Sequence, residues 1–261
     1  MSDRKHDRGP RSEFKSIVKN NFRWAAALAK WASNVVHKDS AHNKNVWNDK
    51  LATEIAFWDR YLATEGLSWP EEFRRRTDAE AEMEPPIARF VESENCKILD
   101  VGAGPLTVVG TRWKGHKMDV TAVDPLADAY TGLLEKYKIV PPVRTQKVAA
   151  EELSLYFGQN TFDLSFARNC LDHSYDPFLA IQQMLSVTKQ GGTIVLLHEI
   201  NEGSNELYRG LHQWNFTVDN SDLRISAPGR DSIHVAGKLG ASVDVSVTRD
   251  EGWVTAVIRK N

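Results

Sequence analysis

The chain has 261 residues, of which 41% are hydrophobic and 26% are charged, and its formal net charge is −2. This length and apolar share predict one α/β domain with an appendage. The sequence has no run of about 18 apolar residues, so no membrane-spanning helix is predicted. The first 50 residues carry eleven lysines and arginines against five acidic residues, so the remainder is net acidic. An acidic body argues against a nucleic-acid substrate.

The two cysteines, Cys96 and Cys170, each fall in or next to an expected strand. Two such residues make no metal-site spacing, so buried thiols in a reducing compartment are the preferred interpretation. The charged first residues are followed by no apolar signal-peptide core, which favours a cytoplasmic location.

The basic front of the chain, residues 1–45, is expected to form a unit of its own. Residues 1–13 are polar and charged, which indicates disorder. Over residues 14–36, apolar residues recur at helical spacing with lysines and an arginine beside them, which predicts a basic amphipathic helix. We expect its apolar face to dock on the body or on a second copy in a homo-oligomer. Contact with an anionic membrane, at its periphery, is the alternative.

Residues 46–94 are expected to form a helical cap. A helix is predicted from Asn45 to Thr64, because Trp47, Leu51, Ile55, Trp58 and Leu62 make an apolar stripe. A charge-rich, solvated connector is expected over residues 71–84 and a short helix over residues 87–91. The cap would close over the ligand edge of the domain that follows.

The chain is organised around residues 96–110, CKILDVGAGPLTVVG. Residues 97–101 read as a buried strand that runs directly into the turn Gly102-Ala103-Gly104. Glycines let the backbone approach a ligand closely, because they carry no Cβ. Asp100 at the strand tip can receive an ammonium group, at the edge where doubly wound sheets bind ligands.

A dinucleotide is a poor fit to this turn. Its fingerprint requires a third glycine where Thr107 stands, and Pro105 removes a backbone N–H that a pyrophosphate would use. The turn therefore favours a small cationic nucleoside over a nicotinamide dinucleotide.

Strands and helices then alternate. Expected strands are 118–123, 143–148, 162–167 and 193–198, the expected helices are 127–137 and 177–187, and a final strand pair is expected at 242–248 and 253–259. This order predicts an open, doubly wound, mostly parallel α/β sheet with a terminal antiparallel hairpin and an N-terminal helical extension. The domain would span residues 95–261, with an insertion at about 199–240.

Asp124 ends the second of these strands, about twenty residues after Gly104. A carboxylate there can accept both hydroxyls of a ribose, in a nicotinamide or an adenosyl ligand alike. The alternative is an N-cap for the helix that begins at Ala127.

Four motifs appear in a characteristic order: DVGAGP from Asp100, the Asp124 tip, AEEL from Ala150, and FDLSFARNCLDHSYDP from Phe162. Together they resemble the class I S-adenosylmethionine-dependent methyltransferases. The resemblance covers about residues 98–200, and the terminal hairpin fits the last two strands of that family. It implies a Rossmann-like enzyme with S-adenosyl-L-methionine as cofactor.

The resemblance also implies roles for individual residues. Asp100, Gly102 and Gly104 would cradle the methionine part of the cofactor, and Asp124 the ribose. The adenine would lie against Leu126, Ala150 and Glu151, and the reacting methyl near Arg168 and Asn169. Two positions depart from the family pattern: Leu106 replaces a frequent glycine, and Ala149 a frequent carboxylate.

A hydroxyl acceptor also needs a base for its proton. His173, with Asp172 beside it, and His198 are the candidates, since both positions face the methyl in this architecture. Histidine has a suitable ordinary pKa. For His173, packing or capping of the next helix is the alternative.

The insertion is expected to select the acceptor. Its carboxamides, carboxylates and aromatic faces suit a polyhydroxylated molecule such as a sugar, and the binding candidates are Asn201, Glu202, Tyr208, His212 and Trp214. An amphipathic lid helix is the alternative. Chelation of a divalent metal by Asp172, His198 and His212 is a weaker idea, and no metal site is assigned.

We therefore expect an S-adenosylmethionine-dependent methyltransferase, with O-methylation of a small molecule or saccharide as the favoured reaction. The alternatives are N- or C-methylation of another metabolite, an NAD(P)-dependent dehydrogenase, and a non-catalytic cofactor-binding scaffold recruited through its N-terminal helix.

Overall fold

The computed structural model describes residues 44–261. The predicted tail over residues 1–13 and the predicted basic helix over residues 14–36 lie outside this range. No helix within it combines the length and apolarity needed to cross a membrane.

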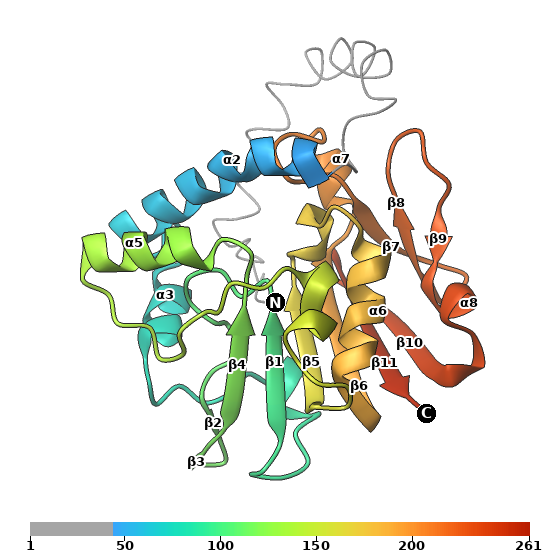
Figure 1. Cartoon of the computed structure of the whole chain (residues 1–261), viewed down its shortest axis with the longest axis horizontal. Helices are drawn as coiled ribbons and strands as arrows, with labels where there is room; N and C mark the ends of the chain where they lie inside the picture. The colour runs from blue at the N-terminus through green and yellow to red at the C-terminus, as the bar shows by residue number, and fades with distance from the viewer. Residues whose placement is uncertain (1–43) are drawn as a thin grey trace, which may run out of the picture.

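Figure 1 shows an open sheet with helices around it. The helices are α2 (Lys44–Ala63), α3 (Pro70–Thr77), α4 (Pro85–Ala88), α5 (Ala127–Tyr137), α6 (Pro177–Val187), α7 (Glu202–Asn205) and α8 (Val235–Leu239). The strands are β1 (Lys97–Val101), β2 (Arg112–Trp113), β3 (His116–Lys117), β4 (Asp119–Val123), β5 (Phe162–Arg168), β6 (Thr188–Glu199), β7 (Asn215–Asp219), β8 (Asp222–Ser226), β9 (Ile233–His234), β10 (Val243–Asp250) and β11 (Trp253–Lys260). Short 3₁₀ helices are η1 (Ala150–Leu155), η2 (Leu171–His173) and η3 (Gly240–Ser242).

In the described part of the chain the main sheet has six strands in the order β10-β11-β6-β5-β1-β4. β1 pairs in parallel with β4 and with β5, and β5 pairs in parallel with β6. β11 joins β6 antiparallel and pairs antiparallel with β10. The predicted doubly wound, mostly parallel sheet with a terminal antiparallel hairpin is confirmed.

Apolar side chains cover both faces of this sheet, as β1 illustrates. Ile98 packs with Met83 and Ile87 on one face, while Leu99 packs with α6 residues such as Ile181 on the other. Successive strand residues point to opposite faces, so a strand buried on both sides must be apolar throughout.

The expected strand over residues 143–148 is wrong. Only one isolated bridge forms there, between Val123 and Gln146. Gln146 exchanges its backbone hydrogen bonds with Ala122 and Asp124 at the very end of β4. Pro141 and Pro142 have no N–H to donate, so these two residues cannot contribute to a ladder, and Thr145 instead donates its hydroxyl to the Gly104 carbonyl.

The expected solvated connector over residues 71–84 is also wrong, because it contains α3. Phe73 of this helix is buried, and Arg75 and Arg76 donate to the Val108 and Leu106 carbonyls after the glycine turn. The helix is amphipathic, and two of its three arginines bind the loop while Arg74 stays exposed to solvent.

The insertion after β6 is mostly β structure, not a lid helix. α7 is a single short turn, and β7, β8 and β9 form a three-stranded antiparallel sheet. Phe216, Leu223 and Ile225 from this sheet are fully buried in the same core as α6. The insertion therefore packs as part of the core.

Helix α2 lies over the edge where the parallel strands end (Figure 1). It packs beside α5, and its Tyr61 and Leu62 are buried with Phe73 and Leu106. Polar residues at the strand ends therefore face a helix that precedes the whole sheet in the chain.

Candidate active site

The glycine turn after β1 folds back onto the end of β4. Gly102 and Gly104 have φ angles of +67° and +65°, a region that favours glycine. The N–H groups of Gly102 and Ala103 both donate to the carbonyl of Val123. A Cβ on Gly102 would clash with Cys170, and one on Gly104 would lie 2.6 Å from the Trp58 ring.

Asp100 is 1% exposed at the end of β1. Its Oδ2 accepts a hydrogen bond of 2.6 Å from the Thr107 hydroxyl. Burial raises the pKa of the Asp100 carboxyl to about 6, although Thr107, Arg76 and Arg168 oppose the rise. Thr107, which stands where a dinucleotide site has glycine, thus holds the carboxylate at the strand tip.

Asp124 follows β4 and faces the turn. Its Oδ2 accepts the Gly104 N–H at 3.1 Å, and its Oδ1 accepts the Leu126 N–H at 2.9 Å. Burial, with a further contribution from Glu54 of α2, raises the pKa of Asp124 to about 7. Leu126 occupies the N-cap position of α5, so Asp124 binds that cap's backbone rather than being the cap itself.

Ala150 and Glu151 begin the 3₁₀ helix η1. Glu151 Oε1 accepts the N–H groups of Tyr175 and Asp176, at 2.9 and 3.2 Å. Burial raises the pKa of this carboxyl to about 7. The Glu151 carboxylate thus binds the backbone N–H groups just before α6.

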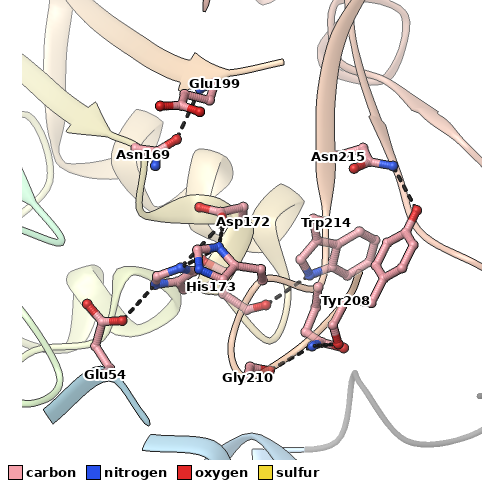
Figure 2. Close-up of polar contacts among 12 residues, drawn as sticks. Glu54, Asn169, Asp172, His173, Glu199, Tyr208, Gly210, Trp214 and Asn215 are labelled. Carbon is pink, nitrogen blue, oxygen red and sulfur yellow. Dashed lines mark hydrogen bonds and ion pairs between the residues drawn. The ribbon is translucent and has the colours of Figure 1, made fainter. Parts of the chain in front are cut away.

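Arg168 and Asn169 lie at the end of β5. The Arg168 guanidinium is 3.4 Å from Glu72 of α3 and sits over the Trp253 ring. Asn169 has a left-handed backbone, and its Oδ1 accepts the N–H of Glu199 at 3.0 Å (Figure 2). Asn169 therefore joins the carboxyl ends of β5 and β6.

Three side chains converge just beyond β5 (Figure 2). His212 Nδ1 is 2.8 Å from Asp172 Oδ2 and 3.0 Å from His173 Nε2, and His173 Nε2 is 3.4 Å from the same carboxylate oxygen. Burial alone would raise the pKa of Asp172, but the two histidines hold it below its ordinary value. Asp172 and His173 were expected at the reaction centre, while His212 was expected in acceptor binding.

His198 lies elsewhere. It is 1% exposed on β6, and its ring stacks on Phe216 at 4.3 Å. Neither ring nitrogen has a hydrogen-bond partner among the described residues, and burial lowers the pKa of His198 to about 4. The imidazole is therefore neutral at physiological pH and closed to solvent.

The other insertion residues mostly hold the insertion together. Trp214 is buried and donates its Nε1–H to the Ser174 carbonyl at 2.9 Å. The Tyr208 hydroxyl lies 2.9 Å from both Ser204 and Asn215. Asn201 is exposed, whereas Glu202 is buried and close enough to raise the pKa of His212.

Helix α2 contributes residues that were not assigned to the site. Trp47 donates its Nε1–H to the His173 carbonyl at 2.6 Å, and Glu54 Oε2 lies 3.6 Å from His173 Nδ1. Glu54 Oε1 accepts from Trp58 Nε1 at 2.7 Å. The spacing of Glu54 and Trp58, four residues apart, predicts a pair on one helix face, but not which surface that face covers.

These residues fit an adenosyl cofactor. The glycines keep the turn free of Cβ atoms where the strands end, and Asp124 lies beside them with lone pairs left for ribose hydroxyls. Asp100 is buried, and within residues 44–261 its side-chain hydrogen bond comes from the neutral Thr107 hydroxyl, so an ammonium group would offset its burial.

The family model described as "Methyltransferase domain" matches residues 99–196. Among solved structures, the chain is similar to 1,6-didemethyltoxoflavin-N1-methyltransferase from Burkholderia thailandensis, at 15% identity over 82% of this chain and 90% of that one, with a TM-score of 0.44. It is also similar to S-adenosylmethionine-dependent methyltransferases from Methanosarcina mazei and from Aquifex aeolicus. These have 18% and 16% identity, cover 69% and 65% of this chain and 98% and 85% of theirs, and have TM-scores of 0.41 and 0.39. No curated protein matches the sequence.

Residues 99–196 thus form a methyltransferase domain, in a sheet with the strand order of the class I fold. The domain match and the fold support an S-adenosylmethionine-dependent methyltransferase over the dehydrogenase and scaffold alternatives.

Proposed function

We propose that the enzyme O-methylates a hydroxyl group of a small polyhydroxylated acceptor, of the saccharide class. The cluster of Asp172, His173 and His212 carries this proposal. It lies at the carboxyl edge of the sheet, directly after the β5 tip, and combines one buried carboxylate with two imidazoles. A hydroxyl must lose its proton during transfer, whereas an amine needs only to be unprotonated beforehand.

The cofactor supplies the methyl group and its activation. The protein then has to hold the acceptor in line, exclude water and remove the proton. In our proposal, Asp100, Gly102, Gly104, Asp124, Leu126, Ala150, Glu151, Arg168 and Asn169 form the cofactor side of the site. The acceptor hydroxyl loses its proton at the cluster. His198 has no part in this proposal, because it is closed to solvent and neutral.

The surroundings of the cluster favour an acceptor that donates hydrogen bonds. Glu54 lies beside His173, and Glu202 is close to His212, so carboxylates flank both imidazoles. Next to His173, the rings of the buried Trp47 and of Tyr175 meet edge to face with centroids 5.9 Å apart. Carboxylates and aromatic rings together suit a sugar, which presents hydroxyls and an apolar face.

We further propose that residues 46–94 act as a cap and that the insertion at about 199–240 selects the acceptor. Contacts from both sides reach the same 3₁₀ turn, η2. Trp47 binds the His173 carbonyl from the cap, and the Gln213 N–H binds the Asp172 carbonyl from the insertion. A change in either element would therefore be transmitted to the cluster.

The test is identification of the product. Purified enzyme and isotope-labelled S-adenosylmethionine are incubated with monosaccharides, nucleotide-sugars, glycans, phenols and amines, and the position of the new methyl group is read by NMR. We expect a methyl ether of a sugar hydroxyl. A product methylated on nitrogen or carbon would contradict the proposal.

A substitution tests the cluster once an acceptor is known. We expect His173→Ala to lower turnover by about 10²- to 10⁴-fold while binding of S-adenosylhomocysteine is kept. His234→Ala, at a histidine whose side chain is 45% exposed and pairs with Asp219, is the matched control. Equal turnover in both variants would remove the cluster from the reaction.

A further inference from the structure

The three ligand atoms of the cluster form one small triangle. Its edges are 2.8 Å between His212 Nδ1 and Asp172 Oδ2, 3.0 Å between the two imidazole nitrogens, and 3.4 Å between His173 Nε2 and Asp172 Oδ2. One proton on His212 Nδ1 can be shared between Asp172 Oδ2 and His173 Nε2, which accounts for the 2.8 and 3.0 Å edges. A second proton on His173 Nε2 would place two donors face to face across the 3.0 Å edge. The short 3.4 Å edge between His173 Nε2 and Asp172 Oδ2 is therefore left without a hydrogen bond of its own.

We propose that Asp172, His173 and His212 bind a divalent transition-metal ion, which holds the acceptor hydroxyl; this second role rests on the function proposed above. Bonds of about 2.0–2.1 Å to nitrogen and oxygen separate neighbouring ligands by about 2.8–3.0 Å in octahedral geometry and about 3.3–3.4 Å in tetrahedral geometry. The three observed edges match that spacing. Three protein ligands on one side leave the other coordination positions open to oxygen atoms of an acceptor or of water.

Burial and outer contacts support the same conclusion. Asp172 is 1% exposed, and its Oδ1 has no hydrogen-bond partner among the described residues. Glu54 faces Nδ1 of His173, and Trp58 holds that carboxylate in place. Metal-binding histidines commonly direct the remote ring nitrogen at a carboxylate, which fixes the ring and strengthens the ligand.

An ion can reach this site, because the His173 and His212 side chains are 18% and 28% exposed. Two imidazoles and one carboxylate suit Zn²⁺, Co²⁺ or Mn²⁺ better than Mg²⁺ or Ca²⁺, which prefer sites made of oxygen alone. Bound to the acceptor oxygen, such an ion would make the hydroxyl a stronger acid, so the proton can pass to water or a nearby carboxylate before transfer.

The test uses Co²⁺ and the full chain after treatment with a chelator. We expect a visible absorption band that saturates at one ion per chain and is abolished by an equivalent of Zn²⁺. His212→Gln and Asp172→Asn should each weaken Co²⁺ binding by about 100-fold, and Glu54→Gln by about 10-fold. His116→Ala and His234→Ala, at exposed histidines outside the cluster, should leave binding unchanged.

Two results would overturn the proposal: no band with the wild-type chain, or a band that His212→Gln and Asp172→Asn leave intact. Because the wild-type spectrum is measured first, the proposal stays testable if a variant fails to fold. Failure here is distinct from failure of the proposed reaction. If the chain binds no Co²⁺ and still methylates a sugar in the presence of chelator, only the proposed metal site is refuted. If the chain binds Co²⁺ but its product is methylated on nitrogen, the metal site stands and the proposed hydroxyl acceptor is refuted.

Discussion

Replacing Asp124 with asparagine should stabilise the cofactor-free protein at alkaline pH while it weakens cofactor binding. The Asp124 carboxyl is 8% exposed, and burial raises its pKa to about 7 from an ordinary 3.8. In the unfolded chain it is ionised above about pH 4. Between these two values the unfolded state binds fewer protons than the folded one, so stability falls as pH rises.

The size of the effect follows from that shift. About three pKa units correspond to about 4 kcal/mol lost by pH 8, a loss that a neutral asparagine avoids. Asparagine has one acceptor oxygen, so either the Gly104 or the Leu126 N–H loses its partner, at a cost of about 1–3 kcal/mol. We therefore expect Asp124→Asn to gain about 1–3 kcal/mol at pH 8.

The pH dependence separates this effect from ordinary repacking. The lost hydrogen bond costs about the same at any pH, whereas the ionisation cost is smaller by about 3 kcal/mol at pH 5 than at pH 8. Urea unfolding of the wild type and the variant at both pH values, without cofactor, measures the difference. If the advantage of the variant is the same at pH 5 and pH 8, the carboxyl is not ionised against its burial and the reasoning fails. Calorimetric titration should show affinity for S-adenosylhomocysteine lowered by about 1–3 kcal/mol.

Two further predictions concern the fold that holds the site. Gly102→Ala should lower stability by more than 2 kcal/mol, since the new Cβ clashes with Cys170 and the backbone φ is +67°. In the control Gly132→Ala, in α5, the new Cβ meets nothing within 4 Å, and the protein should be stabilised by about 0.5–1 kcal/mol. Thermal melts that rank the two variants the other way would contradict the turn geometry. Phe216→Ala should lower the free energy of unfolding by about 3–5 kcal/mol, because the ring is fully buried. The control Leu155→Ala, at a side chain 78% exposed, should change it by less than about 0.5 kcal/mol. If both variants shift the urea midpoint equally little, the insertion does not share the core.

Short-range patterns were sufficient for much of the fold. Helices over residues 127–137 and 177–187 begin and end where their periodicity predicts, and the β1 strand and its glycine turn lie where apolar alternation gives way to glycine. These patterns involve only residues that are near one another in the sequence, so they can be recognised without the tertiary structure. The strand over residues 143–148 failed because a strand also needs a partner ladder, which the residue pattern does not report.

The sequence by itself also placed Asp100, Asp124 and His173 at the ends of strands, since parallel strands bring those ends to one edge. It did not distinguish His198, which is sealed inside, from His212, which meets His173 from 39 residues away. His198 follows the apolar run Ile194–Leu197 and His212 lies between Leu211 and Gln213, and neither local pattern reports which imidazole is enclosed. Burial and long-range contact arise only when distant segments pack together, so the tertiary structure decided which imidazoles join Asp172 and which carboxylate of α2 stands behind them.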